Sequence, residues 1–244
     1  MPDVTRGFSL INKENSYDFA MYIPGHHNSR IHPKKEISPD EHQNILAAMI
    51  GDGCLLKNTA RGTYRLAWNM GNKPHALSKL EAFSGFNSSY NERDNPGFGE
   101  KWYQVRTSCW KGFDHYAEKY GHSRNGYKCG LISSELNALG WAIYFGDDGH
   151  SSVSNNHLTV AIHTEGFTES QCNEIAVNLE NFIGVDGGVS VKSYIGGTKK
   201  RKMFFILLTS SEAKYEFFKK ITPHMENGVE YKIKLDSLNY TPKK

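Results

Sequence analysis

Two acidic residues each follow an apolar run and precede a glycine: Asp52 in "MIGDG" and Asp148 in "YFGDDG". Carboxylates beside apolar sequence are costly to hold unless water, a cationic side chain or a metal ion compensates their charge. Mg²⁺ prefers oxygen ligands and is usually held by one or two carboxylates together with phosphate oxygens. The two acids therefore predict a divalent-metal site for phosphate chemistry, provided that the fold brings them together.

An internal repeat indicates how the acids could meet. "ISPDEHQNILAAMIGDGCLLK" begins at Ile37 and "ISSELNALGWAIYFGDDGHSS" begins at Ile132. Each segment has a helix start signal, a run of small and apolar residues, and an Asp-Gly pair before strand-like sequence. Ser38 and Pro39 in the first copy provide an N-cap and a proline at the first helical position. In the second copy we expect Ser133 or Ser134 to be the N-cap.

The elements expected after each acid also repeat. The first series is strands at 54–57 and 64–70, a helix at 74–83, strands at 88–93 and 101–109, and a helix at 111–120. The second series is two strands, the later one at 158–163, a helix that begins at Thr168 with a capping-box Gln171, strands at 189–195 and 203–209, and a helix at 212–221. The sequence thus predicts an α+β fold of two αββαββα repeats, 38–131 and 132–244, each with a four-stranded antiparallel sheet under helices. Residues 1–37 form a predicted non-catalytic extension.

The two helices that open the repeats are apolar on nearly every side, which is typical of helices in an interior. Small residues at four-residue spacing, Ala47 with Gly51 and Ala142 with Gly146, allow close backbone approach. We expect the two helices to pack together about a pseudo-twofold axis, so that their C-terminal ends meet.

"ILAAMIGDG" and "WAIYFGDDG", in this order and in this context, resemble the two motifs of single-chain LAGLIDADG homing endonucleases. The resemblance covers Ile37 to about Lys234. It implies a site-specific endonuclease that makes a double-strand break in a long, asymmetric DNA target by Mg²⁺-dependent phosphodiester hydrolysis. It also implies that Mn²⁺ or Ca²⁺ can occupy the metal site and that the protein acts as a monomer on double-stranded DNA.

The resemblance also implies residue roles. Asp52 and Asp148 match the metal-binding acids, and Gly51 and Asp147 hold the adjacent, less essential positions of the metal site. One lysine from each half is expected near the scissile phosphates: Lys128 in "GYKCGL" and Lys232 in "EYKIK". The bulky Trp141 and Tyr144 of the second motif depart from the family pattern without altering the acids.

Strand alternation predicts which side chains face away from the helices. Arg, Lys, Asn and Gln read base edges in the major groove, which admits β-ribbons. The side chains expected on this DNA-binding face are Arg65, Asn69, Gln104, Arg106, Thr159, His163, Lys192 and Tyr194. A basic hairpin tip is expected to contact phosphates: Lys199, Lys200, Arg201 and Lys202.

Composition adds broad limits. The chain has 29 basic and 26 acidic residues, a net charge of +3 that does not by itself identify a partner. Its four cysteines form no C-x-x-C pair, so we expect free thiols in a reducing compartment. No segment has the length and apolarity of a membrane span or the pattern of a signal peptide. We expect a soluble intracellular protein without membrane contact, in a mitochondrion or plastid by analogy with the family.

Other functions remain open from the sequence. The main alternative is an intron RNA maturase, which has the same fold, binds RNA and does not cut DNA. "GDD" also resembles a motif of viral RNA polymerases, but the preceding helical pattern and the second copy at Asp52 argue against that function. A calcium loop at "DDGHSSVSNN" lacks the glutamate expected at its twelfth position.

Overall fold

The computed structural model describes most of the chain after residue 35 and two short strands before it. The described residues are 12–13, 16–17, 36–58, 62–94, 101–121, 130–196, 201–238 and 240. The short strands, β1 (Asn12–Lys13) and β2 (Ser16–Tyr17), pair antiparallel.

The two central helices end at or just before the acids, as the repeat predicts. Helix α1 spans Pro39–Ile50 and has the predicted capping box of Ser38 and Glu41. Helix α4 spans Ala138–Asp148, and its N-cap is Asn137, whose side chain accepts from the Gly140 amide at 3.1 Å. The prediction that Ser133 or Ser134 caps α4 is wrong, because both serines lie in a separate 3-10 helix, η3 (Gly130–Glu135).

The first repeat forms a four-stranded antiparallel sheet with the strand order β3-β4-β6-β5. Its elements follow the predicted series: β3 (Cys54–Asn58), β4 (Thr63–Met70), α2 (Lys73–Ala82), β5 (Ser89–Asp94), β6 (Lys101–Arg106) and α3 (Phe113–Tyr120). One face of this sheet packs on the core through Leu66, Trp68 and Val105, which are almost fully buried.

The second repeat forms a matching antiparallel sheet with the order β7-β8-β10-β9. Its elements are β7 (Gly149–Ser154), β8 (His157–His163), α5 (Glu169–Ile183), β9 (Val189–Gly196), β10 (Arg201–Leu208) and α6 (Ser211–Ile221). The predicted capping box of Thr168 and Gln171 opens α5. The α+β class and the two αββαββα repeats are therefore confirmed.

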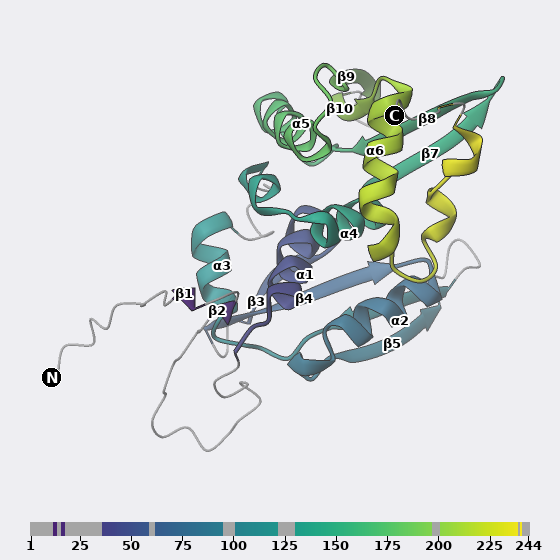
Figure 1. Ribbon diagram of the computed structural model, residues 1–244. Helices are drawn as coiled ribbons and strands as arrows, with labels where there is room; N and C mark the ends of the chain where they lie inside the picture. Colours follow the sequence, from purple (N-terminus) through teal and green to yellow (C-terminus); the bar gives the residue numbers. More distant parts are fainter. Residues whose placement is uncertain are drawn as a thin grey trace, which may run out of the picture.

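Helices α1 and α4 lie side by side between the two sheets (Figure 1). The Gln43 side chain of α1 donates to the Glu135 carbonyl at 2.9 Å and accepts from the Asn137 amide at 2.9 Å. A Cβ atom added at Gly51 would lie 2.9 Å from the Cβ of Asp147. Glycine at position 51 is therefore what allows the C-terminal ends of the two helices to approach so closely.

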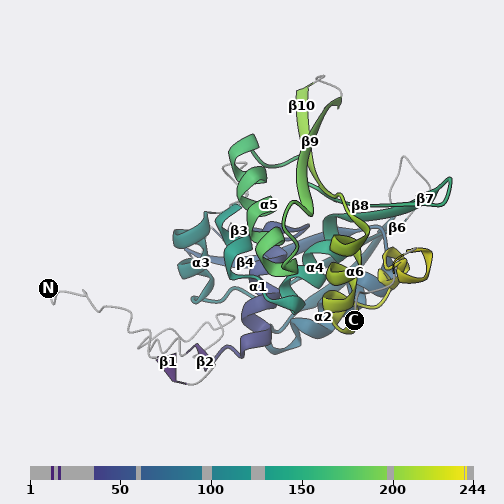
Figure 2. The same cartoon turned by 45° about the horizontal axis from the view of Figure 1, so that its top comes forward.

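The second sheet extends further from the centre than the helices that cover it. Figure 2 shows β9 and β10 as a long hairpin that projects beyond α5. Within the described part of the chain, no helix combines the length and apolarity that a membrane crossing requires.

Candidate functional site

The two predicted acids lie at the junction of the repeats, where α1 and α4 end. Asp52 follows Gly51, the C-cap of α1, and is exposed, whereas Asp148 is the last residue of α4 and is half-buried. The backbone amide of Asp52 donates to Oδ2 of Asp147 at 3.2 Å. Residues that are remote in sequence are thus brought to one place, as the packing of the apolar helices predicts.

Lys232 lies at the same junction, in the 3-10 helix η5 (Glu230–Lys232). Its ammonium donates to the carbonyl of Gly146 at 2.6 Å and to that of Asp147 at 3.3 Å, the last turn of α4. Burial lowers the pKa of Lys232, and the charges of Asp147, Asp52 and Asp148 partly offset this effect. A cation at this helix end opposes the negative end of the helix dipole beside two acids. The other predicted lysine, Lys128, lies outside the described residues.

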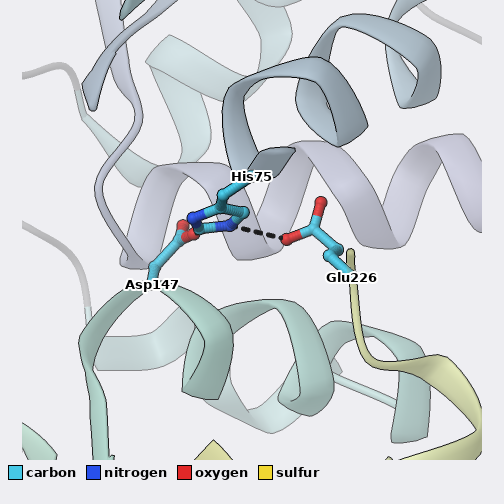
Figure 3. Close-up of side chains that lie close together, drawn as sticks. All are labelled: His75, Asp147 and Glu226. Carbon is cyan, nitrogen blue, oxygen red and sulfur yellow. Dashed lines mark hydrogen bonds and ion pairs between the residues drawn. The ribbon is translucent and has the colours of Figure 1, made fainter. Parts of the chain in front are cut away.

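Asp147 has a different environment from the one predicted. Its side chain is 0% exposed and forms ion pairs with Lys79 Nζ at 2.9 Å and His75 Nε2 at 3.3 Å. Figure 3 shows His75 of α2, Asp147 of α4 and Glu226 of the C-terminal segment pointing toward one another. The expectation that Asp147 is an auxiliary metal ligand therefore needs correction, since buried cationic groups already contact its carboxylate. Gly51 contributes close packing against Asp147.

We call the four buried ionisable residues His75, Lys79, Asp147 and Glu226 the Lys79 cluster. Burial alone would raise the pKa of Asp147, but the Lys79 charge and the His75 hydrogen bond hold it below its ordinary range. Burial alone would lower the pKa of Lys79, but Asp147 and Glu226 together raise it. The pKa of His75 is likewise raised, because hydrogen bonds that its ring donates to both acids outweigh burial. The contacts within the cluster therefore favour the charged forms of Asp147, Lys79 and His75.

The outer face of the first sheet carries the side chains that alternation predicts. Ala67 pairs with Arg106 and Asn69 pairs with Gln104 across β4 and β6, which puts these residues on the face opposite the core. The pKa of Arg106 is lowered by burial and by the charges of Arg65 and Arg93, so three arginines share this face. Gln104 is only 7% exposed, and its amide donates to Asn69 Oδ1 at 2.8 Å.

The same face holds two residues of β5 that sequence reasoning missed. Asn91 pairs with Gln104, and Arg93 pairs with Trp102. In "SYNERD" these residues alternate with Tyr90, which packs on the core, so the period-two pattern was the signal that could have found them.

The second sheet has a less basic outer face. Thr159 is exposed and His163 is half-buried, while Lys192 and Tyr194 are exposed on β9. His163 and the Tyr194 hydroxyl both contact Glu165 Oε1 at 3.0 Å. Three apolar residues of β10 alternate onto the same face: Met203, Phe205 and Leu207. Phe205 pairs with His163 and Lys192, and Met203 pairs with Tyr194.

The predicted basic hairpin is only partly described. Lys199 and Lys200 lie outside the described residues, and Arg201 is exposed at the start of β10. Lys202 forms an ion pair with Glu169 of α5 at 3.2 Å. The prediction that Lys202 contacts phosphates with Arg201 needs correction, because alternation turns Lys202 toward the helix-covered side.

Comparisons with known proteins show the fold. No protein-family model and no curated protein matches the sequence. Among solved structures, the homing endonuclease I-WcaI bound to its DNA recognition sequence aligns over 81% of this chain and 87% of its own, with 18% identity and a TM-score of 0.65. I-DmoI in complex with DNA and Ca aligns over 75% and 89%, with 14% identity and a TM-score of 0.44.

The chain therefore has the two-repeat α+β fold of the LAGLIDADG homing endonucleases, as the two motifs predict. One solved structure with this fold, that of I-WcaI, aligns over most of both chains.

Proposed function

We propose that this protein is a site-specific DNA endonuclease that cuts both strands of a long, asymmetric target. The main support for the proposal is the junction of the repeats, where the charges of Asp52 and Asp148, one from each repeat, both act on Lys232. The ends of these helices already carry partial negative charge, so stability alone does not favour two acids there. A site that binds cations and phosphates accounts for both acids.

The donor chemistry fits a divalent cation such as Mg²⁺. Asp52 and Asp148 offer carboxylate oxygens, the ligands that Mg²⁺ prefers, and substrate phosphate oxygens would complete the coordination. When bound, such an ion activates water and stabilises charge on phosphoryl and leaving oxygens. Asp52 and Asp148 are the residues that would hold it. Mn²⁺ and Ca²⁺ suit the same oxygen ligands.

Lys232 supplies a fixed positive charge for the reaction. In hydrolysis a water oxygen forms a bond to phosphorus, the bond to the 3′ oxygen breaks, and a 5′ phosphate and a 3′ hydroxyl remain. Negative charge develops on the phosphate during this step, and a preorganised ammonium stabilises it. Hydrogen bonds to two carbonyls of α4 hold the Lys232 ammonium in place.

The two sheets would supply target recognition. Their outer faces carry arginine, asparagine, histidine, lysine and tyrosine side chains, which are suited to base edges in the major groove. The homing endonuclease I-WcaI, which shares this fold, has been solved bound to its DNA recognition sequence. Because the two faces differ in composition, the two half-sites should differ in sequence.

Selection from a random duplex library tests this function. Bound duplexes are recovered with Ca²⁺ present and are then incubated with Mg²⁺. We expect the unaltered protein to cut both strands of the selected target, and Asp52→Asn or Asp148→Asn to bind it without making the double-strand break. Asp186→Asn, an exposed acid after α5, is the matched control and should cut normally.

The maturase alternative predicts a different result. Under that alternative the protein binds structured intron RNA more tightly than any duplex DNA and cuts no duplex in the library. The same two acid substitutions would then leave RNA binding unchanged, and the nuclease proposal would be contradicted.

A further inference from the structure

The Lys79 cluster joins three parts of the chain at one buried point. Lys79 Nζ lies 2.9 Å from Oδ1 of Asp147 and 2.6 Å from Oε2 of Glu226, and His75 Nε2 lies 3.0 Å from the same Glu226 oxygen. Lys79 and His75 belong to the first repeat, Asp147 to the second motif, and Glu226 to the segment that leads to Lys232. Both Lys79 and His75 therefore pair with the two acids, and the positive charge of Lys79 does not depend on the protonation of His75.

The cluster has the ligand types of a metal site, but its cation position is already filled. Candidate ligand atoms of His75, Asp147 and Glu226 lie within 4.8 Å of one another. The Lys79 ammonium, on a side chain only 1% exposed, lies within hydrogen-bond distance of both carboxylates. A metal ion would have to displace this ammonium, so the cluster is better explained as an internal ion-pair network.

Asp147 connects the Lys79 cluster to the backbone of Asp52 through its carboxylate. One carboxylate oxygen, Oδ1, pairs with Lys79 and His75, and the other, Oδ2, accepts the backbone amide of Asp52 at 3.2 Å. This amide belongs to the predicted metal-binding acid of the other repeat. The cluster therefore fixes the backbone that carries Asp52 from across the repeat boundary.

The hydrogen bond from the Asp52 amide to the Asp147 side chain has no side-chain counterpart at the matching position of the first motif. The residue before the acid is Asp147 in the second motif and Gly51 in the first, and glycine has no side chain that could contact Asp148 in the same way. The pseudo-symmetric relation of the two acids is thus broken at this position. A change at Asp147 should disturb Asp52 more than Asp148.

We propose that Asp147, held by the buried ammonium of Lys79, is a positioning residue that orients Asp52 for cleavage of one DNA strand. The inference rests on the proposed endonuclease function. Asp147 contacts neither substrate nor metal in this role. It acts through the backbone hydrogen bond to Asp52, and its effect should therefore appear on one strand.

The first measurement does not depend on activity. Hydrogen exchange at the Asp52 amide, followed by NMR in the full-length protein, should speed up in Asp147→Ala. In Asp147→Asn exchange should stay slow, because the amide oxygen of asparagine can still accept the bond. Glu226→Gln is the matched control, since it weakens the same cluster without touching Asp52. Unchanged exchange in folded Asp147→Ala would overturn the inference while leaving the proposed function intact.

The second measurement resolves the two strands. Single-turnover cleavage of a duplex labelled on each strand gives a rate constant for each. In Asp147→Ala we expect one rate constant to fall by about 10- to 100-fold, as a small misplacement of a reactive group produces. The slowed strand should be the one that Asp52→Asn also slows most. Asp147→Asn should recover most of the lost rate, and Glu226→Gln should affect the two strands equally.

The strand-resolved rates distinguish failure of the positioning role from failure of the endonuclease proposal. Equal slowing of both strands in Asp147→Ala, or slowing mainly of the strand that Asp148→Asn affects, would overturn the inference and leave the endonuclease proposal standing. Absence of cleavage by the unaltered protein on its selected target would contradict both. If Asp147→Ala does not fold, Asp147→Asn takes its place. A small slowing of the strand that Asp52→Asn slows most would support the inference. No difference between the strands, or slowing of the other strand, would contradict it.

Discussion

The buried ammonium of Lys79 links α2 to α4 and to the C-terminal segment through ion pairs. A lysine that is almost fully removed from water is stable as a cation only if acids surround it, and Asp147 and Glu226 do so. In the sequence "ALSKLEAF" this lysine has the pattern of an exposed helical residue. Its partners come from the second motif and from the C-terminal segment, so no local pattern could predict the cluster. The acids themselves were predictable, because the duplicated motifs mark them.

Replacement of Lys79 by methionine tests the ion-pair network. We expect the free energy of unfolding to fall by about 3–5 kcal/mol, because two acids lose their buried counter-charge. Lys73→Met on the same helix is the control, since Lys73 forms an exposed pair with Glu92 and such pairs contribute about 0–1 kcal/mol. Denaturant unfolding measures both variants, and equal stability of Lys79→Met and the parent would contradict the account.

His42 predicts a pH dependence of stability. It is buried in α1, its Nδ1 lies 2.6 Å from the Tyr116 hydroxyl, and burial lowers its pKa from 6.5 to about 4. Between these two values the unfolded state binds more protons than the folded state, so stability should fall as the pH drops from 6.5 toward 4. The loss amounts to at most about 3 kcal/mol.

Unfolding free energies between pH 4 and pH 7 test this prediction. In His42→Gln the part of the slope due to His42 should disappear, so parent and variant should converge in stability as the pH falls. Parallel curves for the parent and His42→Gln would contradict the assignment.

At the scale of elements, the contact between α1 and α4 determines the site. The apolar character of both helices predicted their packing, and the Asp-Gly pairs predicted that their ends meet. The position of closest approach was not predictable, because the expected pairs Ala47 with Gly51 and Ala142 with Gly146 are not symmetric in the structure. Gly51 faces Asp147, whereas Gly146 lies against Val229 of the C-terminal segment.

A methyl group at position 51 should disturb this contact. Gly51→Ala would place its Cβ against the Asp147 side chain, and we expect a loss of about 1–3 kcal/mol from overpacking. Gly71→Ala is the matched control, because no atom lies within 4 Å of a Cβ added there. Thermal or denaturant unfolding measures the difference, and equal effects of the two substitutions would contradict the packing argument.

The two sheet faces predict different base preferences. The arginines of the first sheet suit guanine, whereas Met203, Phe205 and Leu207 of the second sheet suit the methyl group of thymine. Strand alternation predicted the residues of these faces well, since the pleat alone decides the side. Strand β10 is apolar on both faces, so the sequence did not distinguish its outer residues from its core residues.

Modified bases separate the two kinds of contact. With the Asp52→Asn, Asp148→Asn double variant, uracil in place of thymine in the half-site of the second repeat should weaken binding. The same change in the half-site of the first repeat should have little effect. Replacing guanine by 7-deazaguanine should weaken binding mainly in the half-site of the first repeat. Phe205→Ser should remove the sensitivity to uracil. Equal sensitivity of the two half-sites would contradict the assignment of the faces.

Across the whole molecule, the chain is a pseudo-symmetric pair of repeats that differ at Asp147 and on the outer faces of the two sheets. The fold could be predicted from the sequence because capping boxes, period-two strands and duplicated motifs all agree. The Lys79 cluster could not, because it assembles from three distant segments. The predicted monomeric state, organellar location and role of Lys128 stay predictions.

The most direct test of the central claim is to map both cut positions on the selected target duplex with Mg²⁺ present. We expect one break on each strand at a fixed offset, with 5′ phosphate and 3′ hydroxyl ends, and loss of both breaks in the Asp52→Asn, Asp148→Asn double variant. Intact duplex, or breaks that persist when both acids are replaced, would contradict the proposed endonuclease function.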